Sequence, residues 1–457
     1  MSRRGMTLVE MLVAMMATLV LMTAVAQVFA VFGNSITGSR AVLDLDGRMR
    51  NAAWRLRSDL AGATARLVPP LAAESGEGYF EIIEGPATDA AAAAGATVGA
   101  ADHDDAILLT TRNTDVPFLG RASTLGGTTI EGQSDMFEST LAEVAWFARK
   151  TPGASNPETY TLYRRQLLVM GYVGTDPFES GDNSMTWAAA GSSWAAYFNL
   201  PCDVSVRREQ NSDEDRLFPN TLADLTRREN RFMHNPAGLT GTAAFPSAFV
   251  NHQAVTPEPG LIFDTTQRQG EDVILTNVLA FDVRVFDPGA PVFVTSGSTA
   301  LVPGDPGFTA ISSTSSGAYV DLGHGVATNS LLSAVVTGGN ATKFAGFGQS
   351  KSGLQGTATT RRTYDTWSTH YEANGLNEDG DTVTDQGTDG VDNDNDGAFD
   401  EPASDAEGDG VFEDLGEAET LPPYPVPLRG VEIRIRCYEP SSRQVRQVTV
   451  RHTFVPH

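Results

Sequence analysis

The sequence predicts an α+β fold in which one long N-terminal helix packs on a head built around an antiparallel β-sheet. An apolar run at 11–32 leads into helical spacing of apolar residues as far as residue 67. Beyond that point, short strand-like stretches follow one another without helical patterns between them, and long insertions separate them. Strands without intervening helices favour an antiparallel sheet.

The apolar run is long enough to cross a membrane. Residues 11–32 contain only three polar side chains, and such a helix is roughly 33 Å long, against roughly 30 Å of hydrocarbon. Arg3 and Arg4 form a basic leader that stays cytoplasmic. We therefore expect a single-pass protein with everything after Phe32 outside the cytoplasm.

Glu10 does not fit a plain anchor, because a carboxylate in an apolar run is costly unless it finds a partner. It closes the segment Gly5-Met6-Thr7-Leu8-Val9-Glu10. This segment resembles the prepilin signal of type IV pilins and type II secretion pseudopilins. The resemblance implies cleavage by prepilin peptidase between Gly5 and Met6, N-methylation of Met6, and pairing of Glu10 with the new amine of a neighbouring subunit. Met6 departs from the family, where Phe is commoner.

Two other interpretations of the N-terminus stay open. The run could be an uncleaved anchor, or a secretory signal peptide cut after Ala24-Val25-Ala26, before Gln27.

The helix is expected to continue beyond the membrane. An apolar stripe recurs at spacings of three and four, and charged residues, Asp59 among them, are expected to cover the other face. The stripe consists of Val42, Leu45, Met49, Ala53, Leu56, Leu60, Ala63 and Leu67. Pro69-Pro70 is expected to end the helix. Because Gly33 and Gly38 weaken the helix between its two halves, the alternative of a membrane helix followed by a separate soluble helix stays open.

The predicted organisation is a leader (1–5), a transmembrane helix (6–32), its continuation (33–70) and a β-rich head (71–457) that contains an acidic insertion (376–419). Residues 70–105 are expected to be a loop, and the long tracts at 172–260 and 287–360 are expected to be loops or extra strands that decorate the sheet. The predicted strands are 106–111, 142–147, 160–170, 273–286, 431–438 and 445–455, the last two forming a hairpin. Several of these stretches are similar to large minor pilins and pseudopilins of the PilW and GspJ type.

The charge is concentrated in the acidic insertion. Glu378 to Glu419 contains 17 acidic and no basic residues, which leaves only eight of the 25 net negative charges for the rest of the chain. This balance argues against a nucleic-acid partner, which would require a basic patch, and favours a local cation site.

One stretch of the insertion predicts calcium binding. Asp392, Asp394, Asp396 and Asp400 occupy positions 1, 3, 5 and 9, with Gly397 at position 6 and the Ala398 carbonyl at position 7. It is similar to the short calcium loops of thrombospondin type 3 repeats or dockerins, but Ala403 replaces the final Glu of an EF-hand. A weaker copy uses Asn377, Asp379, Asp381 and Asp385. The alternative is a solvated, disordered acidic insertion.

Other chemistry is not indicated. Cys202 and Cys437 are the two cysteines, and they could form one bridge or remain two free thiols. The seven histidines form no metal-protease motif, and no nucleotide-binding or hydrolase signature occurs.

The sequence therefore predicts a non-enzymatic assembly subunit at the inner membrane, incorporated into a pilus or pseudopilus. Its expected partners are other pilin or pseudopilin subunits, prepilin peptidase, the inner-membrane assembly platform and membrane lipid. A calcium-dependent adhesin displayed on an anchor and a secreted hydrolase are the alternatives.

Overall fold

The computed structural model describes the N-terminal helix and most of a β-sheet head. The described residues are 7–67, 76–84, 102–121, 136–151, 157–170, 272–287, 362–366 and 428–454, together with shorter pieces within 184–232 and 290–321.

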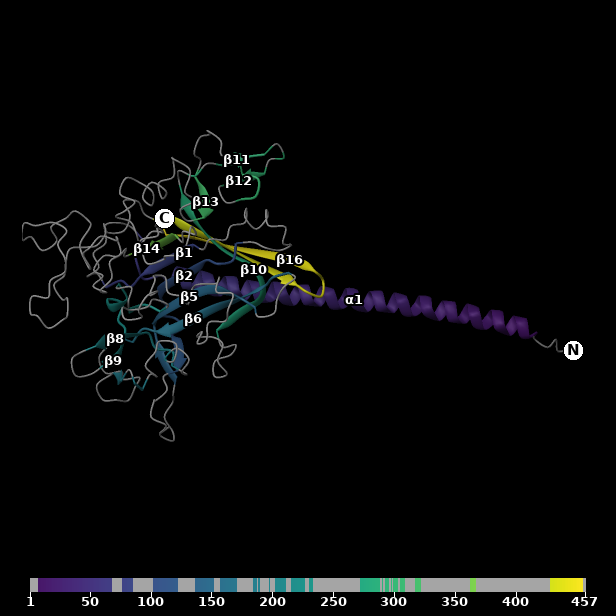
Figure 1. The fold of residues 1–457 in the computed structure, drawn as a ribbon, viewed down its shortest axis with the longest axis horizontal. Coiled ribbons are helices and arrows are strands. Elements are labelled where there is room, and N and C mark those ends of the chain that lie inside the picture. Colours follow the sequence, from purple (N-terminus) through teal and green to yellow (C-terminus); the bar gives the residue numbers. More distant parts are fainter. Residues whose placement is uncertain are drawn as a thin grey trace, which may run out of the picture.

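The N-terminal helix α1 (Leu8–Ala61) is continuous over 54 residues. Figure 1 shows its first half extending away from the head and its second half lying against the sheet. The predicted apolar stripe is buried from Val42 to Leu60. The expectation of one continuous helix is confirmed, and Gly33 and Gly38 do not interrupt it.

The end of α1 differs from the prediction in two ways. The helix stops at Ala61, before the predicted boundary at residue 70, because the chain turns at Gly62 into close contact with the sheet. A Cβ at Gly62 would lie 2.4 Å from the carbonyl oxygen of Arg112, so the approach requires glycine. The prediction that Asp59 faces solvent is also wrong, since its side chain is buried.

Within the described residues, nine antiparallel strands form the main sheet, in the order β14-β1-β2-β5-β6-β10-β15-β16, with β13 also paired to β10 (Figure 1). Its strands are β1 (Phe80–Glu84), β2 (Ala106–Arg112), β5 (Leu141–Lys150), β6 (Tyr160–Leu168), β10 (Val273–Asp287), β13 (Ala318–Asp321), β14 (Arg362–Asp365), β15 (Gly430–Glu439) and β16 (Gln444–Thr453). The antiparallel sheet and the β15–β16 hairpin are as predicted.

Smaller sheets decorate this one. They are β3 (Phe118–Arg121) with β4 (Met136–Ser139), β7 (Met185–Thr186) with β9 (Asp215–Pro219) and β8 (Val206–Gln210), and β11 (Phe293–Val294) with β12 (Ala300–Leu301). A 3-10 turn, η2 (Asp224–Thr226), follows β9.

The prediction of loop throughout residues 70–105 is wrong at β1. Its five residues, Phe-Glu-Ile-Ile-Glu, are too few to show a clear period, and β1 is fixed instead by pairing with β2 on one side and β14 on the other.

The central strands are buried on both faces. On β2, Ile107 and Leu109 face the core under α1, whereas Ala106 and Leu108 face a second apolar cluster that includes residues of β7, β8 and β9. Alternate residues of a strand point to opposite faces, so covered faces on both sides produce a nearly continuous apolar run.

Candidate functional site

The start of α1 is a capping box built from Thr7 and Glu10. The Thr7 side chain accepts the backbone N–H of Glu10 at 3.3 Å, and the Glu10 carboxylate accepts the backbone N–H of Thr7 at 2.9 Å. Two of the N–H groups left open at a helix N-terminus are thereby satisfied. This capping role was not among the expectations from sequence, although the Thr-x-x-Glu spacing is its local signal. Gly5 and Met6 lie outside the described residues.

The first half of α1 is apolar and uncovered by the rest of the chain. Leu12, Leu19 and Phe29 are more than half exposed, and none of the most apolar window is buried. The Thr18 and Thr23 hydroxyls donate to the carbonyl oxygens of Ala14 and Leu19, four residues earlier. Both hydroxyls are thereby satisfied within the helix, as a medium without water requires. This is the one helix among the described residues that could span a membrane.

Asp59 fixes the second half of α1 to the sheet. Its carboxylate accepts two hydrogen bonds from Arg164 of β6 at 2.8 Å and a third from the Trp146 indole of β5 at 2.8 Å. The two charged side chains keep only 4% (Asp59) and 11% (Arg164) of their exposure. A bidentate pair of this kind sets geometry as well as energy, so it positions α1 on the sheet.

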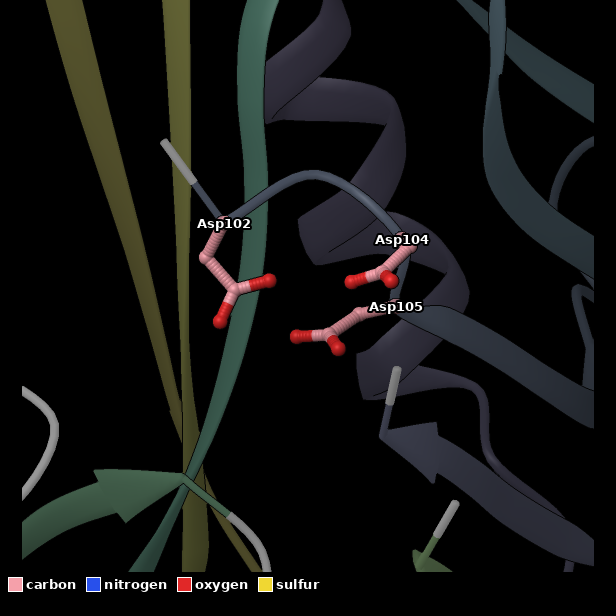
Figure 2. A group of neighbouring side chains, drawn as sticks. All are labelled: Asp102, Asp104 and Asp105. Carbon is pink, nitrogen blue, oxygen red and sulfur yellow. The ribbon is translucent and has the colours of Figure 1, made fainter. Parts of the chain in front are cut away.

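Three buried carboxylates converge where the chain enters β2. Figure 2 shows Asp102, Asp104 and Asp105 directed into one space between β2 and β10. Within this group, and within the group of Asp102, Asp282 and Asp321, one ligand atom from each residue lies within 4.8 Å of the others. Carboxylate oxygens are the ligands that hard cations prefer.

Arg284 of β10 already supplies positive charge to this region. It forms ion pairs with Asp282 at 3.1 Å, Asp321 at 3.2 Å and Asp305 at 2.8 Å. Burial lowers the pKa of Arg284, but the carboxylates of Asp282, Asp321 and Asp305 outweigh burial and hold it above its usual value. The Asp105 carboxylate accepts the backbone N–H of Val283, so part of this group also serves strand pairing. Asp102, Asp104 and Asp105 are close in sequence, but Asp282 and Asp321 follow Asp102 by 180 and 219 positions, so no local signal in the sequence indicates the whole cluster.

The predicted calcium loops, Asp392 to Asp400 and Asn377 to Asp385, lie outside the described residues. Calcium binding there stays a prediction.

The two cysteines do not form the bridge that the sequence left possible. Neither is in a disulfide and both are buried, Cys202 in the cluster under β7–β9 and Cys437 in the core under α1, so the main sheet separates them. Burial raises the pKa of Cys437 to about 12 and also raises that of Cys202. Both thiols are therefore protonated at neutral pH.

A polar cavity of about 600 Å³ lies beside β15 and β16. It is lined by Arg57, Glu432, Arg434, Gln447, Thr449 and Arg451. The buried Glu432 carboxylate pairs with Arg434 at 2.7 Å and with Arg451, so two arginines share this one acid.

Comparison with known families identifies the N-terminus. The family model described as the prokaryotic N-terminal methylation motif matches residues 1–26. No curated protein and no solved structure matches the chain. The prepilin-type motif followed by a long apolar helix is consistent with a pilin-like or pseudopilin-like protein, and it implies processing by prepilin peptidase and assembly with other pilins.

Proposed function

We propose that this chain is a minor structural subunit, without enzymatic activity, of a type IV pilus or a type II secretion pseudopilus. One observation carries the proposal: the prepilin-type motif leads without a break into a single helix whose first half is apolar and exposed and whose second half is packed on a large head. An exposed apolar half needs a membrane or neighbouring helices to cover it.

The orientation follows from charge. Arg3 and Arg4 precede the apolar run, so the N-terminus would lie in the cytoplasm and the head on the other side of the inner membrane. After assembly the same helix would lie among its neighbours in a filament.

The head half of α1 also offers a surface to neighbours. Leu43 and Trp54 are 70% and 66% exposed, and their separation of eleven residues places them on one face of the helix, opposite the buried stripe. Exposing a large apolar side chain to water is unfavourable in free energy unless a partner covers it. This face therefore supports contact between subunits.

A low-copy position is favoured by the size of the head. The described residues alone form a nine-stranded sheet and three small sheets, which is bulky beside a single helix. Heads of this size hinder close packing along a continuous fibre, which favours a place at the tip or at initiation.

The acidic insertion supports an additional calcium-dependent role. The spacing from Asp392 to Asp400 suits a hard cation, and a tip subunit could use such a loop to order a binding surface. A displayed adhesin is the second candidate function. It differs from an assembly subunit in having no need for Glu10.

N-terminal mass spectrometry of protein from the native envelope tests the proposal. We expect a mature chain that begins at Met6 and carries a methylated amine. A Gly5→Val variant should retain the leader, since cleavage in the family follows glycine. A chain that begins at Met1 or at Gln27 would contradict the proposal.

A further inference from the structure

The turn of the β15–β16 hairpin lies against α1 at the membrane side of the head. Ser442 Cβ is 3.8 Å from the position that a Cβ on Gly38 would take, and Arg446 Nε is 4.0 Å from the Asp46 carboxylate. Among the described strands, this hairpin reaches farthest along α1 toward the N-terminus (Figure 1).

The helix fixes the height of this turn above the membrane. Gly38 follows Phe32, the end of the apolar run, by six residues, which at 1.5 Å each is roughly 9 Å. The polar layer on each side of the hydrocarbon is roughly 5–7 Å thick. The turn would therefore lie at the level of the lipid headgroups or just outside them.

The chemistry of the turn suits an anionic lipid surface. Arg443 in the turn and Arg446 on β16 are exposed, in a chain whose net charge is −25. Tyr438 and Val445 are cross-strand partners at its base, and Val445 is 52% exposed. Arginines beside a tyrosine and an exposed aliphatic side chain are the residue types that lie at membrane interfaces.

The nearby acids do not cancel this charge. The Glu439 carboxylate accepts the backbone N–H groups of Ser441 and Ser442, so it is directed into the turn and not toward the lipid. Asp46 lies on α1 at the limit of contact with Arg446. Arg443 and Arg446 are exposed, whereas Glu439 is buried and Asp46 is half-buried, so the exposed charge at the turn is mainly positive.

We propose that the β15–β16 turn docks on the anionic phospholipid surface from which α1 emerges. The inference rests on the proposed function for the insertion of α1 in a membrane. A single helix leaves its head free to tilt relative to the membrane plane. A second contact, made by Arg443 and Arg446, would hold one face of the head toward the lipid until the subunit is extracted into a filament.

The test uses the full chain in lipid nanodiscs, with one chain per disc, and a fluorophore on a Ser441→Cys variant. Cys202 and Cys437 are buried, so the introduced thiol is the reactive one. Quenching by a headgroup-attached nitroxide is compared between phosphatidylcholine discs and discs that contain about one third phosphatidylglycerol. We expect strong quenching in the anionic discs and weaker quenching at high salt, because exposed charges are screened.

Charge reversal gives the decisive comparison. Near an anionic surface each arginine changes the docked-to-undocked ratio about fivefold, so Arg443→Glu with Arg446→Glu should lower that ratio by at least about 25-fold. Arg57→Glu is the matched control: it lies nineteen residues beyond Gly38, roughly 29 Å farther from the membrane, and should have no effect.

Equal quenching in both lipids, or none lost on charge reversal, would overturn the inference. A change in the fluorescence of the label at position 441 that occurs only when several chains share a disc would also overturn it, because a neighbouring chain would then cover the turn. Flotation after carbonate extraction reports insertion separately. A chain that inserts but does not dock refutes this inference alone, whereas a chain that fails to insert refutes the membrane anchor of the proposed function as well.

Discussion

Replacing Asp59 by asparagine tests whether one buried carboxylate holds α1 on the head. Asparagine keeps the shape and can still accept the Trp146 indole N–H, but it removes the negative charge that Arg164 contacts at 2.8 Å through two nitrogens. The guanidinium would remain between β6 and α1 with Gln166 as its neutral partner.

The structure sets the expected size of the effect. Removing one partner of a buried ion pair costs about 3–5 kcal/mol, because the other charge is left uncompensated. Arg164 keeps 11% exposure and its bond to Gln166, so we expect the lower end, about 3 kcal/mol. The matched control is Asp44→Asn, the same change on the same helix. Asp44 pairs with Arg48 one turn away, and both side chains are more than half exposed, so its loss should cost at most about 0.5 kcal/mol.

Guanidinium unfolding of the full chain in detergent, followed by tryptophan fluorescence, measures both variants. The midpoint should fall for Asp59→Asn with an unchanged slope, since the surface exposed on unfolding stays the same. An Arg164→Met variant and the double variant complete the cycle, and the double variant should be more stable than the additive sum. If Asp59→Asn costs no more than Asp44→Asn, the buried pair does not fix the helix and the reasoning is wrong.

Three further predictions address the assembly residue, the metal loop and the thiols. Glu10→Gln should retain the capping hydrogen bonds and lose the charge. If Glu10→Gln and Glu10→Ala both insert normally in the membrane but enter filaments weakly, Glu10 pairs with a neighbour's amine. If Glu10→Gln enters filaments at the wild-type level, helix capping is the role of Glu10. Calorimetric titration of the chelator-stripped chain should show calcium binding and a higher melting temperature, lost in Asp394→Ala and kept in His370→Ala. No heat at millimolar calcium would refute the site. Burial raises the pKa of Cys437 to about 12, so its thiol should not react with a disulfide reagent at pH 8 until the protein is denatured, and rapid native reaction would contradict the burial.

Features that depend on short-range periodicity could be predicted from the sequence. The stripe from Val42 to Leu60 specified the buried face of α1, and the alternation in residues 431–438 specified which side of β15 faces the core. The prepilin motif is also local, and the comparison with known families bears it out. Each of these signals lies within a short stretch of sequence, so it does not depend on how the rest of the chain folds.

The tertiary structure decided the features that depend on distant partners. β1 is a strand because it pairs with β2 on one side and with β14, about 280 positions later, on the other. Asp59 is buried because β5 and β6 bring Trp146 and Arg164 beneath a charged position of the helix. Pairing a strand with a distant partner depends on the whole topology of the sheet, which no local window contains.

The same reason separates the two cysteines and gathers the buried carboxylates. From the sequence, Cys202 and Cys437 could have formed a disulfide, but the main sheet places them on opposite faces. Asp102 meets Asp282 and Asp321 only because β10 and β13 close over the entry to β2. The sequence by itself determined the anchor, the helix and the strand type of the head. Which charged groups are buried, and beside what, was determined by the packing of segments that are remote along the chain.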